Sequence, residues 1–94
     1  MYYVEKIHMN PSFPESENCI DIESLYIDFK DIYGLKAYLK SEIYDYLKSH
    51  PKTISVNIAP YPVLIPALSS KYEKYVRSEN NDTVSDNLLK LPRI

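Results

Sequence analysis

The chain of 94 residues has no tryptophan, one glycine and one cysteine. The single cysteine, Cys19, excludes an internal disulfide, and the single glycine, Gly34, excludes the glycine-rich loops that cradle phosphate groups. The longest apolar run, at 63–68, is far shorter than the roughly 20 residues that cross a bilayer as a helix. The first residues lack the basic and apolar segments of a secretory signal. We therefore expect a cytoplasmic protein without a membrane segment.

The charge distribution and the placement of cysteine and histidine exclude further classes of function. The 11 basic residues are scattered among 13 acidic ones, with a net charge of −2, so dedicated DNA binding is not expected. Cys19, His8 and His50 lie far apart in the sequence, without the ligand spacing of a zinc site. A nucleophilic Cys19 would need the fold to bring a histidine to it, and a semi-buried thiol in a loop is the simpler reading. We expect no metal, no cofactor and no catalytic residue, hence no enzyme.

The composition is that of a folded protein, with 45% hydrophobic and 26% charged residues, and the length predicts a single domain over residues 1–94. Ten tyrosines are unusual for this length. One small core cannot hide ten phenol rings, so several are expected on the surface, where each offers contact area and a hydroxyl group.

Alternating and β-branched residues predict strands on either side of a polar loop at 10–18. The segment at 2–9 predicts a first strand, with one face formed by Tyr3, Ile7 and Met9 and the other by Tyr2, Val4, Lys6 and His8. The segment at 20–29 changes register midway. A bulge near Glu23 to Leu25 would bring both of its apolar sets to one face.

Apolar residues then recur every three or four positions, which predicts a helix from Asp31 to about His50. Asp31 is the expected N-cap and Pro51 forces the chain out of helical geometry. The stripe that faces the core consists of Ile32, Leu35, Leu39, Ile43 and Leu47.

The second half of the chain predicts two more strands. The segment at 53–59 alternates, with Ile54, Val56 and Ile58 facing inward. Three prolines within 60–68 predict an apolar loop or an edge extension, and the segment at 71–78 predicts a fourth strand before a polar turn. The expected fold is α+β, a small antiparallel sheet of about four strands in the order β-β-α-β-β with one long helix on one face. Residues 75–94 are expected to form the last strand and an ordered C-terminal arm.

The end of the chain combines an arginine-containing strand, a polar turn and the segment DNLLKLP. This stretch resembles the end of the DUF3892 family of small bacterial and phage proteins, which commonly close in a similar way. The resemblance covers residues 75–92 and rests on Tyr75, Arg77, Ser78, Thr83, Asp86, Asn87, Leu88, Leu91 and Pro92. That family has no established activity. The resemblance therefore implies a fold and a bacterial or phage setting, but no reaction.

Three leucines of the arm raise the question of where they are buried. Ser85, Asp86 and Asn87 can cap a short helical turn that contains Leu88 and Leu89 and ends at Pro92. Such a turn stays ordered only if its leucines are covered, by the chain's own sheet or by a neighbouring subunit. One helix covers one face of a sheet, which leaves the other face or an edge for a partner, so a homo-oligomer is expected.

Cations and phenols on the first and last strands predict a ligand site if the two strands adjoin. The candidate ligand-binding residues are Tyr2, Lys6, His8, Tyr72, Lys74, Tyr75, Arg77, Asp86 and Asn87. Stacking planes beside cations suit a nucleotide or another small anionic ligand, although ordinary cross-strand pairing explains the same residues. A second candidate surface is the acidic segment 15–31, which either meets a basic protein or is simply solvated.

The sequence thus favours a non-catalytic binding protein. The first hypothesis is a phage-encoded sponge that sequesters a nucleotide-type immune signalling molecule. The alternative is a phage or bacterial inhibitor that binds a host protein through the acidic surface.

Overall fold

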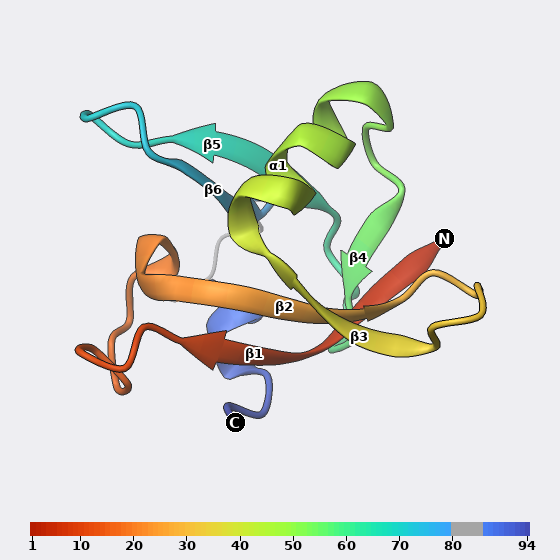
Figure 1. The fold of residues 1–94 in the computed structure, drawn as a ribbon, viewed down its shortest axis with the longest axis horizontal. Coiled ribbons are helices and arrows are strands. Elements are labelled where there is room, and N and C mark those ends of the chain that lie inside the picture. The colour runs from red at the N-terminus through yellow and green to blue at the C-terminus, as the bar shows by residue number, and fades with distance from the viewer. Residues whose placement is uncertain (80–85) are drawn as a thin grey trace.

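A computed structural model describes residues 1–79 and 86–94 of the chain. The described residues form one α-helix packed against two small sheets, so the predicted α+β class is confirmed (Figure 1). The strands are β1 (Tyr2–Met9), β2 (Ile22–Asp28), β3 (Leu35–Leu39), β4 (Ile54–Val56), β5 (Leu64–Leu68) and β6 (Lys74–Ser78). The helices are α1 (Lys40–Ser49) and two short 3-10 turns, η1 (Cys19–Asp21) and η2 (Asn87–Lys90).

The strands form two sheets instead of the single antiparallel sheet that the sequence predicted. The first sheet has the order β3-β2-β1-β4, and the second pairs β5 with β6. β1 and β4 run parallel, while the other neighbours are antiparallel. The predicted order β-β-α-β-β is therefore wrong in detail, because a third strand precedes the helix and a further strand follows it.

The extra strand before the helix replaces the first half of the predicted helix at 31–50. Gly34 has φ +62, a left-handed conformation that no α-helix contains, and Asp31 caps a turn by accepting a hydrogen bond from Tyr33 N. Ile32 is 92% exposed, so it is no part of a core-facing stripe. The helix begins only at Lys40, and its predicted core residues Ile43 and Leu47 are buried as expected.

Two bulges decide which side chains of β1 and β2 face the core. The predicted bulge in β2 is confirmed at Glu23, since Met9 and His8 pair with Ile22 and Ser24. β1 has a second, unpredicted bulge at Glu5. This extra residue places Val4 on the buried face with Ile7 and Met9, which corrects the expected assignment of Val4 to the opposite face.

The proline-rich segment forms β5, which lies in a ribbon of two strands. Pro66 pairs with Val76, and a two-stranded ribbon tolerates a proline because each strand has a free edge. Just before β5, Val63 bridges to Ser55 of β4 and accepts a hydrogen bond from Glu79 N, so one segment joins the two sheets. The predicted strand at 71–78 is shorter, because Tyr72 lies in the turn before β6 with φ 62.

The core lies between the first sheet, α1, the ribbon and the arm. Buried side chains come from every strand except β3 and from both ends of the chain: Val4, Ile7, Met9, Cys19, Ile22, Leu25, Ile27, Ile43, Tyr44, Leu47, Ile54, Val56, Leu64, Val76, Leu88, Leu89 and Leu91. The arm leucines therefore complete the chain's own core, and they need no neighbouring subunit to cover them. Residues 83 and 85, which the sequence singled out, lie outside the described residues.

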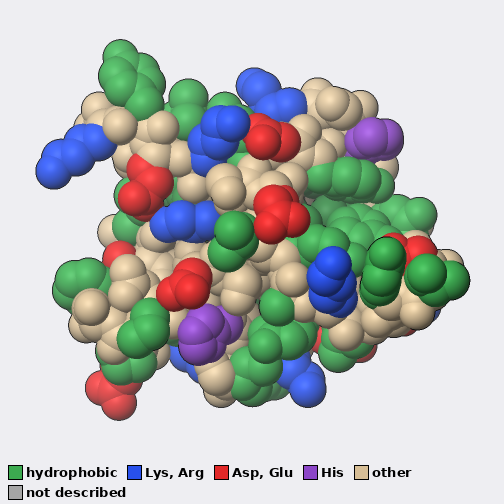
Figure 2. All heavy atoms as spheres, viewed as in Figure 1, with side chains coloured by type: hydrophobic (Ala, Val, Ile, Leu, Met, Phe, Trp, Pro, Cys, Tyr) green, Lys and Arg blue, Asp and Glu red, His purple; other side chains and the backbone are tan. Residues whose placement is uncertain are grey.

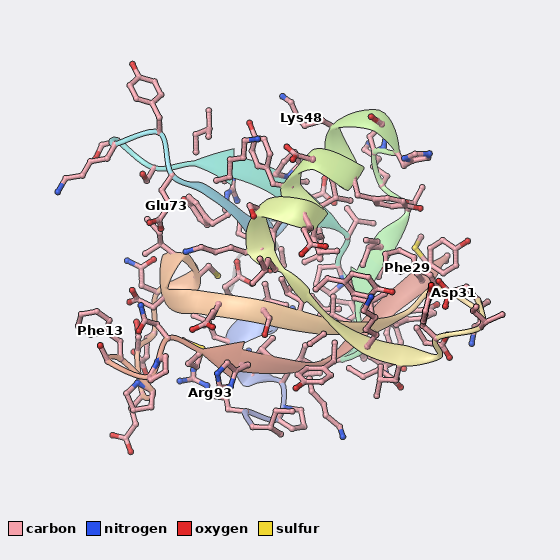
Figure 3. All side chains as sticks on the ribbon, viewed as in Figure 1. Phe13, Phe29, Asp31, Lys48, Glu73 and Arg93 are labelled. Atoms are coloured by element: carbon pink, nitrogen blue, oxygen red, sulfur yellow. The ribbon has the colours of Figure 1, made fainter. Side chains whose placement is uncertain are left out.

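The C-terminal arm also lines one edge of β1 beyond the short strand β4. Ile7 N donates to Pro92 O and Ile94 N donates to Ile7 O, each at 3.0 Å. The Arg93 guanidinium donates to Pro14 O and Leu89 O, both at 3.1 Å, and so joins the loop at 10–18 to η2 (Figure 3). Over residues 86–94 the predicted ordered arm is confirmed.

Candidate functional site

The three strands β1, β2 and β3 have one face in the core and one face that the described elements leave open. Residues paired directly across neighbouring strands share a face. On the inner face Leu25 pairs with Ile7 and Tyr38, and α1 packs on this side. The opposite face, called here the outer face, consists of Lys6, His8, Ser24, Tyr26, Asp28, Leu35, Ala37 and Leu39.

The outer face places a cation, an imidazole and a phenol close together. Lys6 is exposed and lies directly across from Tyr26, which is half-buried. His8 lies across from Ser24, and its Nδ1 donates to Ile94 O at 2.6 Å. The Ile94 oxygen only accepts, so Nδ1 is the donor in this hydrogen bond and Nε2 is the ring nitrogen left for a ligand.

Of the predicted ligand-binding residues, the structure places Lys6 and His8 together on the outer face and places the others elsewhere. β6 pairs with β5, whereas β1 pairs with β2 and β4, so the first and last strands are not neighbours. Tyr2 lies on the inner face, with its ring 5.0 Å from the ring of Phe29. The Glu5 bulge explains why Tyr2 is separated from Lys6 and His8, because it puts Tyr2 on the opposite side of the sheet.

The predicted site residues near β6 have structural partners of their own. Lys74 Nζ lies 2.8 Å from Asp45 Oδ1, and this hydrogen bond raises the pKa of Lys74. Tyr75 packs against the core, and Arg77 Nη1 contacts Ser78 O at 3.4 Å. Tyr72 extends from the turn between β5 and β6 and is 82% exposed.

Asp86 and Asn87, also predicted to bind ligand, belong to the start of the arm. Asp86 is the N-cap of η2, and its carboxylate accepts hydrogen bonds from Leu88 N and Ser78 N. Asn87 is buried, and within the described residues its Nδ2 finds no hydrogen-bond partner. Both residues lie apart from Lys6 and His8 on the outer face, and the geometry gives Asp86 a role in tethering the arm.

β3 is a free edge of the first sheet, in a segment for which the sequence analysis predicted a helix. Leu35 and Leu39 are 41% and 50% exposed, and Ala37 between them is exposed too. Among the described residues, the main chain of 35–38 makes no hydrogen bond outside its pairing with β2. Figure 2 shows apolar side chains gathered over β3 and the β2–β3 connection, at the right of the view. The alternation of Leu35, Ala37 and Leu39 after Gly34 was the signal that could have revealed this strand.

An aromatic cluster closes the core at the same end of the molecule. The ring of Phe29 lies 5.0 to 5.1 Å from the rings of Tyr2, Tyr38 and Tyr46, and Figure 3 shows it between α1 and β3. The ring of His50 stacks on Tyr46 at 4.5 Å. Desolvation, with the nearby carboxylates of Asp31, Asp28 and Glu42, raises the pKa of Tyr38. These ring contacts, which include edge-to-face, tilted and stacked pairs, give the cluster a packing role.

A hollow of about 220 Å³ lies beside this cluster and is lined by Met1, Tyr2, Tyr3, Glu5, Asp28 and Lys30. Pockets that hold drug-sized ligands measure about 300 to 1,000 Å³. Its charged side chains are the two carboxylates of Glu5 and Asp28 and the single lysine Lys30, so the side chains of the hollow do not favour an anion. The end of the outer face that carries Lys6 and His8 is the better candidate for an anionic ligand, because Asp28 lies toward the other end of that face, opposite Leu35.

The environment of Cys19 disfavours nucleophilic chemistry. Burial raises the pKa of the Cys19 thiol, and the nearby Asp86 carboxylate raises it further. The thiolate is the reactive form of cysteine, so this side chain is a buried thiol with a packing role. His8 is bound to Ile94 O and His50 is stacked on Tyr46, so each histidine has contacts elsewhere.

No three side chains among His, Cys, Asp and Glu of residues 1–79 and 86–94 are placed to hold a metal ion. No helix in those residues is long and apolar enough to cross a membrane.

The acidic segment 15–31 does not form one continuous patch. Asp28 and Asp31 accept main-chain hydrogen bonds in the β2–β3 connection, whereas Asp21 accepts one from Ser16 Oγ before β2. The seven residues of β2 separate these two groups by about 20 Å. The freely exposed carboxylates at the first end are those of Glu15, Glu17 and Glu23.

Comparisons with protein-family models, with curated proteins and with solved structures find no match for this chain. The resemblance of residues 75–92 to the DUF3892 family therefore stays a prediction. The function has to be argued from the geometry of the outer face and its edge.

Proposed function

We propose that the protein is a non-catalytic binding protein whose binding surface is the outer face of β1, β2 and β3. The observation that carries the proposal is the pairing of Lys6 with Tyr26 beside His8 on a face that the described elements leave open. A tyrosine ring offers a stacking plane, and lysine and histidine offer donors to an anion.

The ligand chemistry that suits this surface is a planar aromatic group that bears negative charge. A nucleotide-type signalling molecule has both parts, and a protein that only binds it would act as a sponge. Base stacking on an aromatic side chain contributes about 1 to 3 kcal/mol, and a charge-assisted hydrogen bond from Lys6 adds to it. The hydrogen bond between His8 and Ile94 O holds the imidazole in place at this surface.

A thermal shift assay tests this proposal with cyclic dinucleotides and ADP-ribose as probes. A ligand that binds the folded state at 100 times its Kd stabilises it by about 2.7 kcal/mol, which raises Tm by about 10 to 20 °C in a domain of this size. We expect Lys6→Glu to abolish the shift and Lys52→Glu, a matched change at an exposed turn, to preserve it. If no probe raises Tm, the nucleotide version of the proposal is wrong.

A second candidate function is inhibition of a host protein through acidic side chains, and the exposure of Glu15, Glu17 and Glu23 favours it. Asp21 is less suited, because its carboxylate accepts the Ser16 hydroxyl hydrogen bond. Reversal of these three glutamates to lysine should abolish pull-down of a basic host factor, with Glu79→Lys as the matched control. Retention of the host factor by the triple variant would remove this candidate.

A further inference from the structure

β3 is the one edge of the four-stranded sheet that the described chain leaves without a partner. At the other edge, the segment before β5 covers β4, since Val56 N donates to Pro62 O at 2.9 Å and Ser55 bridges to Val63. The arm covers the part of β1 that β4 does not reach. An exposed edge strand presents a row of main-chain donors and acceptors that another strand can pair with.

The sequence of β3 is complementary to itself when two copies run antiparallel. It reads LKAYL, with Ala37 at its centre. About a two-fold axis at Ala37, Leu35 of one copy faces Leu39 of the other, and Lys36 faces Tyr38. Both leucine pairs would lie on the outer face, where these side chains are about half exposed in the single chain.

The charge on this edge is compatible with such pairing. A lysine in an edge strand commonly prevents association, because pairing would bury its charge. Here Lys36 Nζ already lies 4.8 Å from the Tyr33 ring and 5.3 Å from the Tyr38 ring. A lysine placed opposite a tyrosine of the second copy keeps a cation–π contact, so pairing does not leave the charge without a favourable neighbour.

The segment before β3 would extend the contact beyond the five paired residues. In the antiparallel register, residues 32 and 33 of one copy lie alongside the start of α1 of the other. Ile32 and Tyr33 are the large exposed side chains of this segment, and they would add apolar area to the strand pairing. This addition matters, because stable interfaces bury about 1,200 to 2,000 Å² in total.

We propose that two copies of this chain pair through β3, antiparallel about a two-fold axis at Ala37, and so join their sheets into one. The partner is a second copy of the chain, since the edge is complementary to itself residue by residue. This inference goes beyond ligand binding, because the pairing holds whether or not a ligand occupies the outer face. It also places the outer faces of both copies on one continuous sheet.

The test uses charge at position 37, which meets itself across the axis. Residues directly opposite in an antiparallel pair have Cα atoms about 4.5 to 5.5 Å apart, so like charges there repel. Light scattering should give the wild-type chain about twice its monomer mass of 11.0 kDa. Ala37→Lys alone and Ala37→Glu alone should each give the monomer mass, and an equal mixture of the two should regain the dimer mass.

Ser70 supplies the matched control, because it is exposed in the turn between β5 and β6. Ser70→Lys and Ser70→Glu should each remain dimeric. Circular dichroism verifies that all four variants are folded, which Ala37 allows because its side chain is exposed. If the wild-type chain has the monomer mass at every concentration, the proposal is wrong, and Lys36 instead protects the edge from pairing with another strand. The proposal is also wrong if the Ala37 variants are dimeric on their own, or if their equal mixture stays monomeric. None of these results bears on ligand binding at the outer face.

Discussion

The Asp86 carboxylate joins the end of β6 to the beginning of the arm through its hydrogen bonds to Ser78. Ser78 N donates to Asp86 Oδ2 at 3.0 Å, and the Ser78 hydroxyl donates to the same carboxylate. Leu88 N donates to Oδ1 at 2.9 Å, so one side chain also caps η2. The arm is therefore held to the ribbon by polar contacts as well as by its buried leucines.

Asp86→Ala should lower the free energy of unfolding by about 2 to 4 kcal/mol. It removes an N-cap worth about 1 kcal/mol and leaves the buried Ser78 donors without their charged acceptor. Asp31→Ala is the matched control, since Asp31 caps an exposed turn with a bond to Tyr33 N, and it should cost about 1 kcal/mol or less. Urea unfolding measures both, and equal losses would contradict the tethering role.

Leu88→Ala should cost about 2 to 5 kcal/mol, because Leu88 is fully buried in the core. Leu68→Ala removes the same atoms from a half-exposed position in β5 and should cost less than about 1 kcal/mol. Urea unfolding monitored by circular dichroism gives both values. A small loss for Leu88→Ala would show that the arm lies outside the cooperative fold.

Phe29→Ala should cost about 2 to 4 kcal/mol, because the Phe29 ring contacts those of Tyr2, Tyr38 and Tyr46. The other phenylalanine, Phe13, is 55% exposed in the loop at 10–18, so Phe13→Ala should change stability by less than about 1 kcal/mol. Thermal unfolding of the two variants provides the comparison. If both lose the same small amount, the aromatic cluster is not a structural unit.

Cys19 should make the folded protein less stable in alkali. The folded state raises the pKa of the thiol, whereas the unfolded chain releases that proton from about pH 8.5 upward. The unfolded state then binds fewer protons, so stability present at neutral pH falls by up to about 1.4 kcal/mol per pH unit above that value. Unfolding from pH 7 to pH 10 should show a steeper loss for the wild type than for Cys19→Ala. Parallel profiles would contradict the raised pKa.

Sequence patterns predicted those parts of the fold that depend on residues close together in the chain. The bulge in β2 was predictable because Ile22 and the pair Leu25 and Ile27 are visibly out of phase. The bulge at Glu5 was not, because only Tyr2 and Val4, at the start of β1, depart from the alternation of the strand. The apolar spacing from Ile32 to Leu39 fits a helix as well as it fits a loop and a strand. Gly34 and its left-handed conformation decide between them.

The candidate site depended on which strands are neighbours, and that choice is made by contacts distant in sequence. Lys6 and His8 share a face because they are two residues apart on one strand. Tyr26 joins them only through the register of β1 against β2, which both bulges set. The expected contribution of Tyr75 and Arg77 required β6 to adjoin β1, but β5 pairs with β6 in a separate ribbon.

Ligand mapping by nuclear magnetic resonance tests the proposed binding surface most directly. Titration of the isotopically labelled chain with cyclic dinucleotides and ADP-ribose should shift the amide signals of Lys6, His8 and Tyr26. The signals of Tyr72 and Lys74 on the ribbon should stay in place. Shifts confined to the ribbon, or no shift with any probe, would contradict the assignment of nucleotide binding to the outer face.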